Sequence, residues 1–399
     1  MNYKTYDGYT SFNYLEKNLD YKPFSLAKPT NRVPVYDLGL AAEKNDLVQN
    51  LFATYPIISM RDHGFMTPRS SKQMLSYCKQ PHTFFHYKGL SESGVDAIFE
   101  NFMDGIAILT SKAGLKWDDV ILNLGIRLCD IAKQNTITIA TTVDDLLQAK
   151  KKRKVALLLS LEAAGILENE IDRVDVLYGF GIRCMGITYN EANTLGSGLA
   201  EKRDGGLTKF GHRVVKRMNQ LGMAIDISHC GDQTSLDVIT SSSQPVLMTH
   251  AGARELWNTP RMKPDQVLIE CAKKGGVIGV CAAPNTTMSR KREVHTIDSV
   301  MEHVDYLINL VGVDHVGLGP DTFYGDHVAL QKAFDQSLSI SDSHSGESFV
   351  ESPYVEGLEN PTEATQNMIG WMVKHGYSEE HIAKIAGGNV ICALGKIFD

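Results

Sequence analysis

The chain alternates short apolar runs, rich in valine and isoleucine, with longer segments in which apolar residues recur every three or four positions. Short apolar runs are typical of buried strands, and the longer period is typical of helices that pack one face against a sheet. The pattern therefore predicts parallel strands joined by helices. The eight predicted strands are Ile57–Arg61, Gly105–Thr110, Val155–Glu162, Ile182–Tyr189, Met223–His229, Pro245–His250, Gly276–Ala282 and His315–Asp321.

Eight such units in one chain favour an α/β fold of the TIM-like (β/α)8 barrel type. A doubly wound sheet is less well supported, because no glycine-rich phosphate loop follows the first strand. Residues 56–399 are assigned to the barrel. Residues 1–55 are expected to form an extension packed on it, and residues 325–360 a long loop after the eighth strand. Helices are expected at Trp117–Gln134, Thr208–Leu221 and Val300–Val311.

The composition narrows the class of protein. A formal net charge of -7 argues against nucleic-acid binding, which calls for basic clusters, and a hydrophobic content of 43% fits a large buried core. The seven cysteines are scattered and odd in number, as expected for reduced core residues. The sequence has no secretion signal and no apolar stretch long enough for a bilayer. We therefore expect a cytoplasmic protein that acts on a small molecule and has no membrane partner.

The residues that end the predicted strands carry the chemistry. The third strand ends in Glu162, the fifth in His229, the sixth in His250 and the eighth in Asp321. In a barrel the carboxyl ends of the strands meet at one face, where active sites lie. Imidazole nitrogens and carboxylate oxygens are ligands for zinc and similar divalent ions. The set therefore predicts a metal site, although each residue alone would be weak support.

These residues lie in blocks that resemble the membrane (renal) dipeptidase family. The blocks are LEAAG, ITYNEANT, GLTKFGHRVVKRMNQLGMAIDISH, PVLMTHAGAREL, PRMKPDQV, HVGLGPDTFYGD and GGNVICALGKIF, and the resemblance spans residues 57–398. It implies a TIM-like barrel with two metal ions, most often zinc, that hydrolyses dipeptides and related amides, and it implies a homodimer.

The resemblance also implies roles for single residues. Glu162 would bridge the two metal ions, and His229 and His250 would complete the site of the second. Asp321 would orient or deprotonate the attacking water. Arg261 would bind the substrate carboxylate, which its planar guanidinium fits, and Asn193 would line the substrate pocket.

Two positions depart from the family. The first strand ordinarily supplies two metal ligands as a His-x-Asp or His-x-His pair, and the matching residues here are Arg61 and His63. Arginine has no lone pair to offer a metal, so the first metal site lacks a ligand. Where the family has a histidine that steadies the scissile carbonyl, this chain has Tyr189, which can donate a hydrogen bond but cannot carry positive charge.

Three interpretations follow. The one we favour is a one-metal hydrolase in which Arg61 supplies the charge of the missing ion and binds a substrate carboxylate. In the second, a bulge in the first strand turns Asp62 inward beside His63, so that two metal ions bind and simple dipeptides are cleaved. In the third, the barrel has lost catalysis and serves as a binding protein. Another carboxylate-bearing or cyclic amide is an alternative substrate, and one or two ions, most simply zinc, are expected per chain.

Overall fold

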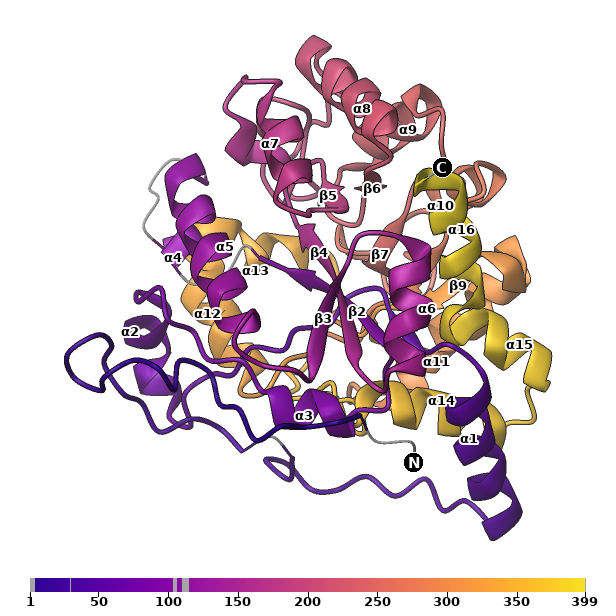
Figure 1. The fold of residues 1–399 in the computed structure, drawn as a ribbon. Coiled ribbons are helices and arrows are strands. Elements are labelled where there is room, and N and C mark those ends of the chain that lie inside the picture. Colours follow the sequence, from indigo (N-terminus) through magenta and orange to yellow (C-terminus); the bar gives the residue numbers. More distant parts are fainter. Residues whose placement is uncertain (1–3, 29, 103–105, 110–114, 399) are drawn as a thin grey trace.

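The fold is a barrel of parallel strands surrounded by helices (Figure 1). The computed structural model describes residues 4–28, 30–102, 106–109 and 115–398. Around the sheet, the strands follow the order β6-β5-β4-β2-β1-β9-β8-β7, and β3 pairs with β4 outside this path. The strands are β1 (Ile58–Ser59), β2 (Ala97–Asn101), β3 (Ile137–Ala140), β4 (Val155–Leu161), β5 (Cys184–Gly186), β6 (Ala224–Asp226), β7 (Met248–Ala251), β8 (Ile278–Val280) and β9 (Val316–Leu318).

Backbone hydrogen bonds just before β7 close the barrel. Ile227 N donates to Leu247 O at 2.9 Å, and Leu247 N donates to Ile225 O at 2.9 Å. These bonds join the two ends of the strand path, so the eight strands form a nearly closed barrel. The TIM-like fold predicted from the sequence is confirmed.

One predicted strand is wrong. Within the predicted strand Gly105–Thr110, the described residues form the short helix α4 (Ile106–Leu109), and the two ends of that range lie outside the described residues. The second barrel strand is instead β2, with the sequence AIFEN. A short apolar run does not distinguish a strand from a buried helix, and the polar Glu100 and Asn101 conceal the true strand. The other seven predicted strands each overlap a strand of the structure, although β7 runs one residue beyond the predicted end, and β3 was not predicted.

Helices cover the outside of the barrel and both of its ends (Figure 1). They are α1 (Ala42–Thr54), α2 (Met74–Cys78), α3 (Tyr87–Glu92), α4, α5 (Trp117–Ile131), α6 (Val143–Lys151), α7 (Arg173–Gly179), α8 (Lys209–Leu221), α9 (Asp232–Ser241), α10 (Asp265–Lys273), α11 (Ile297–Val311), α12 (His327–Leu338), α13 (Ile340–Ser343), α14 (Ala364–Lys374), α15 (Glu379–Ala383) and α16 (Asn389–Phe398). The three helices predicted from periodicity correspond to α5, α8 and α11.

Helix α8 illustrates how local sequence sets these bounds. Thr208 precedes the helix, and its hydroxyl accepts a hydrogen bond from Gly211 N at 3.0 Å. Gly222 ends the helix with φ of 65°, a left-handed conformation that glycine adopts without strain. The cap residues therefore fix both ends of the helix.

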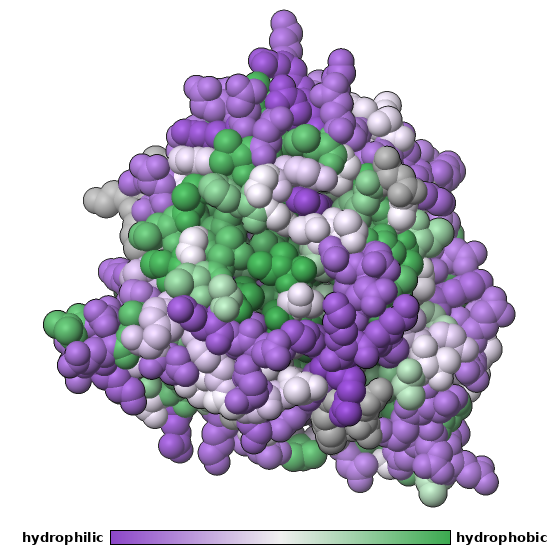
Figure 2. Space-filling view, viewed as in Figure 1, coloured by the Kyte–Doolittle hydropathy of each residue, from purple (hydrophilic) through white to green (hydrophobic). Residues whose placement is uncertain are grey.

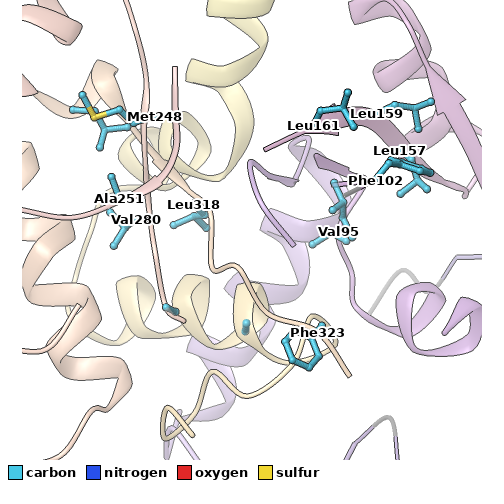
Figure 3. Close-up of a cluster of buried hydrophobic side chains, with 14 of the residues drawn as sticks. Val95, Phe102, Leu157, Leu159, Leu161, Met248, Ala251, Val280, Leu318 and Phe323 are labelled. Atoms are coloured by element: carbon cyan, nitrogen blue, oxygen red, sulfur yellow. The ribbon is translucent and has the colours of Figure 1, made fainter. Parts of the chain in front are cut away.

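Two layers of apolar side chains hold the barrel together. The outer layer lies between the strands and the helices. Figure 3 shows two groups of its side chains: Leu157, Leu159 and Leu161 of β4 on the right, and Met248, Val280 and Leu318 on the left. The inner layer contains the first residues of several strands together with three side chains of α16: Ile58, Ala97, Ala224, Val390, Leu394 and Ile397. Helix α16 therefore covers the amino-terminal ends of the strands, opposite the end where parallel barrels carry their sites.

The residues before β1 run along one side of the barrel in Figure 1, and α1 lies beside α14. Tyr9 donates to Asp130 Oδ1 at 2.7 Å, and Ala27 N donates to Thr67 O at 2.9 Å. These contacts attach the segment to the barrel, while the division of the chain at residue 55 stays a prediction.

The predicted long loop after the last barrel strand is wrong in part, because it contains helices α12 and α13. Asp326 caps α12 by accepting from Ala329 N at 3.0 Å. The two helices meet at Ser339, which has φ of 48°. We call residues 327–343 the cap.

The face of the molecule seen in Figure 1 carries an apolar hollow near its centre, which Figure 2 shows surrounded by hydrophilic side chains. Helices α5 and α7 border this area in Figure 1, and the exposed hydrophobic side chains here are Leu122 of α5, Val176 of α7 and Phe180 just after α7. Apolar patches of this kind are common contact surfaces. The homodimer stays a prediction. The apolar surface beside α5 and α7 is the first place to look for a contact between two copies of the chain.

Glu363, just before α14, makes stability depend on pH. Burial, and then repulsion from Glu359, raises the pKa of Glu363 to about 7 from an ordinary 4.5. Between these values the folded state binds the proton that the unfolded state releases, so this carboxyl lowers stability as pH rises from 4.5 to 7. Replacing Glu363 with glutamine should leave stability near pH 4.5 unchanged and raise it by about 2 kcal/mol at pH 8.

Urea unfolding at the two pH values measures this difference. The exposed Glu43 of α1 provides the control, since Glu43→Gln should change stability little at either pH. An equal effect of Glu363→Gln at both pH values would show that burial does not perturb this carboxyl.

Candidate functional site

Three strand ends bring three potential metal ligands together. Glu162 directly follows β4, His229 lies just beyond β6, and His250 lies within β7. Glu162 Oε1 is 3.3 Å from His229 Nε2 and 3.1 Å from His250 Nε2, and the two Nε2 atoms are 3.0 Å apart. These donor atoms all lie within 4.8 Å of one another. A carboxylate oxygen and two imidazole nitrogens in this arrangement fit one divalent cation with an open position.

The protonation states suit a metal. Burial, and then the Arg261 charge, lowers the pKa of His229 to about 3, and burial lowers the pKa of His250. Burial alone would raise the pKa of Glu162, but the charge of the Arg61 guanidinium holds it well below its usual value. Two neutral imidazoles and a carboxylate are the forms that bind metal ions.

A buried network orients His250. Its Nδ1 lies 2.8 Å from Thr249 Oγ1, and that hydroxyl donates to Asp226 Oδ2 at 2.5 Å. Because the single hydroxyl proton goes to the carboxylate, the threonine oxygen accepts from His250 Nδ1, and His250 Nε2 keeps its lone pair. Metal-binding histidines are commonly held in this way by a hydrogen bond at the other ring nitrogen.

Arg61 lies deeper in the barrel than expected and belongs to this network. Its Nη1 donates to Ser160 Oγ at 3.1 Å, and its Nη2 donates to Asp226 Oδ2 and Thr249 Oγ1, both at 3.3 Å. Its side chain is fully buried, and it does not line the cavity described below. The guanidinium therefore lies beneath the site, and binding of a substrate carboxylate by Arg61 stays a prediction that these contacts do not support.

Asp62 does not turn toward the metal ligands. Its Oδ1 accepts hydrogen bonds from Thr322 N at 2.8 Å and from Thr322 Oγ1 at 2.7 Å. These bonds join the segment after β1 to the segment after β9. The bulge that would have brought Asp62 inward as a ligand is therefore not present.

His63 points toward the site but pairs with carboxylates. Its Nε2 lies 3.1 Å from Asp321 Oδ1, and its Nδ1 lies 3.6 Å from Glu100 Oε1. Burial opposes the charged form, but the bonds to Asp321 and Glu100 raise the pKa of His63 to about 10. Burial would raise the pKa of Asp321, but the electrostatic attraction of His250 and the His63 hydrogen bond keep this pKa below its usual value. A protonated imidazole has no lone pair for a metal.

A cavity of about 90 Å³, partly open to solvent, lies above these residues. Its floor includes Glu162, His229 and Asp321, and its roof comes from the cap, including Leu330, Phe334 and Ile340. A second, larger cavity of about 900 Å³ adjoins it, and both include Tyr189 and Leu338 in their walls. The strand ends and the cap thus form a partly open chamber, lined by both polar and apolar side chains, of the kind that binds small molecules.

Arg261 and Tyr189 are among the polar side chains that line this chamber. Arg261 Nη2 donates to His250 O at 2.9 Å, while its buried Nη1 has no partner among the described residues. Tyr189 stacks on His229 with ring centroids 4.1 Å apart. Burial raises the pKa of Tyr189 well above its usual value, so the phenol keeps its proton. The chamber therefore offers one free cationic donor and one phenolic donor beside the ligands.

Asn193 has a different position from the one expected. Its Nδ2 donates to Ile187 O at 2.8 Å, and its Oδ1 accepts from Leu195 N at 2.8 Å. Asn193 lines the larger cavity and not the chamber. Its side chain braces the loop after β5, and contact with substrate stays a prediction.

Three other polar residues of the site escaped the sequence analysis. Asn101 donates from Nδ2 to Glu162 Oε2 at 2.9 Å, Glu100 accepts from Gly64 N at 2.7 Å, and Asn190 contacts His229. Asn101 and Glu100 belong to β2, one of two strands that the sequence analysis missed. Asn190 directly follows Tyr189, so its place at the end of the fourth predicted strand was the available signal.

Comparisons with known proteins agree with this geometry. The sequence model of the membrane dipeptidase family (peptidase family M19) matches residues 121–337, more than half of the chain. An uncharacterized protein in the pqqA 5' region of Klebsiella pneumoniae is 32% identical over 185 residues, which are 44% of this chain and 68% of that protein. Dipeptidase tcpJ of Claviceps purpurea is 28% identical over 262 residues, 65% of this chain and only 55% of that protein.

A crystal structure of an amidohydrolase from Pseudomonas aeruginosa has the same fold. The two structures superpose with a TM-score of 0.71 at 24% identity, covering 88% of this chain and 99% of the other. The part of the chain that the structure describes contains no helix with both the length and the apolar character needed to cross a bilayer.

Proposed function

Since this chain belongs to the membrane dipeptidase family and is a metal-dependent hydrolase of the dipeptidase type, we propose that it cleaves a small carboxylate-bearing amide with a single metal ion. The observation that carries the proposal is the convergence of Glu162, His229 and His250 within 4.8 Å beneath the free Nη1 of Arg261. Zinc is the ion we propose first, because a His₂Glu set with an open position is a known catalytic zinc arrangement.

A bound divalent ion lowers the pKa of water and polarises a carbonyl group. The chain supplies the remaining functions. Arg261 Nη1 binds the substrate carboxylate and so places the amide bond above Glu162. Asp321, held at Oδ1 by His63, accepts the proton of the attacking water and passes it to the leaving nitrogen. The Tyr189 hydroxyl donates a hydrogen bond to the carbonyl oxygen as charge develops on it.

A single ion is supported by the residues at the other metal position of the family. Arg61 has no lone pair, and both of its Nη atoms donate within the barrel. Asp62 bonds to Thr322, and both nitrogens of His63 face carboxylate oxygens. Arg61 and His63 place positive charge where a second cation would otherwise lie.

The metal content of protein purified without chelators tests this proposal. Elemental mass spectrometry should give close to one equivalent of metal per chain, and dialysis against a chelator should abolish hydrolysis until zinc is added back. The assay panel should contain simple dipeptides and N-acylated amino acids. Two equivalents per chain would overturn the one-metal proposal, and full activity after chelation would overturn the metal mechanism.

Arg261 should determine the preference for a carboxylate. We expect Arg261→Met to lower kcat/KM by about 100-fold on a substrate with a free carboxylate, which is the effect of losing a charged hydrogen bond. On the corresponding carboxamide, the wild type and the variant should differ little. Steady-state kinetics with this matched pair of substrates measures the effect, and an equal loss on both would assign Arg261 a structural role alone.

The remaining expectations are a homodimer and a cytoplasmic location. They stay predictions, which size measurement in solution and cell fractionation address.

A further inference from the structure

We propose that Asn190 is a positioning residue that couples the ligand His229 to the cap, so that metal binding and cap closure favour each other. The inference rests on the proposed metal site. It concerns the buried side-chain amide of Asn190, whose oxygen faces His229 and whose nitrogen faces the cap.

The hydrogen bonds of Asn190 fix the orientation of its amide group. Its Nδ2 donates to Leu338 O at 2.9 Å and is 3.3 Å from Ser339 O. Carbonyl oxygens only accept, so the amide nitrogen must lie on that side, and Oδ1 must face His229. Asn190 is only 1% exposed, so water offers little alternative partner for either end.

This orientation in turn fixes the tautomer of His229. Asn190 Oδ1 lies 2.8 Å from His229 Nδ1. An amide oxygen cannot donate, so His229 Nδ1 must carry the proton, and the lone pair of Nε2 points toward Glu162 Oε1 at 3.3 Å. Asn190 thereby holds the ring in the form and direction that metal binding needs.

The other end of Asn190 holds the joint of the cap. Leu338 ends α12, and Ser339 has left-handed backbone angles of φ 48° and ψ 45° before α13 begins. The joint is also held by Ser339 Oγ, which bonds to Glu191, and α13 is held by Arg261 N, which donates to Ser343 O at 3.0 Å. Arg261 also reaches a metal ligand, through the backbone oxygen of His250, whereas Asn190 contacts the ring nitrogen of His229 itself.

The coupling has a thermodynamic consequence in both directions. A cation that fixes His229 also fixes Asn190 and so favours the closed joint, whereas an open cap leaves Asn190 free to rotate away from His229. Coupling of two equilibria is reciprocal, so whatever metal binding adds to closure, closure adds to metal affinity.

Two variants separate the two contacts. Asn190→Asp keeps an oxygen that accepts from His229 Nδ1 but loses the donor to Leu338 O. Asn190→Ala loses both. Asn219→Ala is a control for loss of an amide, because Asn219 bonds to Ser243 N at 2.8 Å on the far side of α8.

The measurements are zinc affinity, by competition with a chelating dye, and hydrogen exchange of residues 330–343 with and without zinc. In the wild type, zinc should slow exchange in the cap. Asn190→Ala should weaken zinc binding by about 10- to 100-fold and remove the effect of zinc on the cap. Asn190→Asp should bind zinc at least as tightly as the wild type. Its cap should nevertheless exchange faster than that of the wild type, and zinc should no longer slow this exchange.

Each outcome decides the matter. If wild-type protein binds zinc but its cap exchanges at the same rate with and without it, the coupling is absent, whatever the variants do. Retained coupling in Asn190→Ala would assign the link to other residues. If the wild type binds no zinc at all, the proposed function fails first, which separates the two proposals. Unchanged exchange of the barrel strands confirms that the variants are folded.

Discussion

Replacing Glu162 with glutamine is expected to remove most of the bound metal and to lower kcat/KM by about 1,000-fold or more. The loss should exceed the 10- to 100-fold typical of an outer hydrogen-bond partner, because Glu162 is itself a ligand. Its Oε2 accepts from Asn101, and its Oε1 faces the two histidine nitrogens.

A glutamine satisfies neither side of this arrangement. With its NH₂ group toward Asn101, two donors face each other, and with its NH₂ group toward the histidines it occupies their lone pairs. Metal content after dialysis and steady-state kinetics measure the effect. Glu170→Gln, an exposed exchange beyond the same strand, is the control and should be silent. A Glu162→Gln enzyme that keeps its metal and a tenth of its activity would remove Glu162 from the ligand set.

Replacing Arg61 with methionine is expected to lower the free energy of unfolding by about 3 kcal/mol or more. The substitution leaves Asp226 buried without its positive partner, and breaking one side of a buried ion pair costs about 3–5 kcal/mol. Because Asp226 also orients Thr249 and through it His250, zinc affinity should fall by about 10-fold.

A double variant separates loss of charge from loss of packing. Arg61→Met with Asp226→Asn should recover part of the stability, since no unpaired charge remains. Arg254→Met breaks a more exposed ion pair with Asp232 and should cost less than about 1 kcal/mol. Urea denaturation measures all four proteins. A stable Arg61→Met variant with impaired substrate binding alone would instead return Arg61 to the substrate role expected from the sequence.

Much of the fold could be predicted from the sequence because barrel strands are apolar on both faces. Runs such as Val155–Leu161 therefore stand out against the amphipathic helices. The strand Ala97–Asn101 could not be recognised, because its last two residues are polar and serve the site. The cap helices escaped for a related reason, since the sequence SLSISDSHSGES around their joint has the composition of a loop.

The candidate ligands could be predicted because parallel strands must end at a common face, which made Glu162, His229 and His250 neighbours before any coordinates were known. The position of Arg61 could not. The named strand β1 ends at Ser59, and Met60 and Arg61 both turn into the barrel, so alternation of side chains no longer holds there. The hydrogen-bond partners of His229 and His250 could not be predicted either, because they depend on how far the neighbouring strands extend.

The backbone at Asp321 limits how this site can change over evolution. Asp321 has φ of 62°, a left-handed conformation that few side chains other than those of asparagine and aspartate adopt readily. The position must also supply a carboxylate beside His63. Glutamate meets the chemical demand but not the conformational one, and glycine or asparagine meets the conformational one but not the chemical one. Lineages that keep the reaction should therefore hold aspartate here, while those that drift to asparagine or glycine should keep the fold and lose the activity.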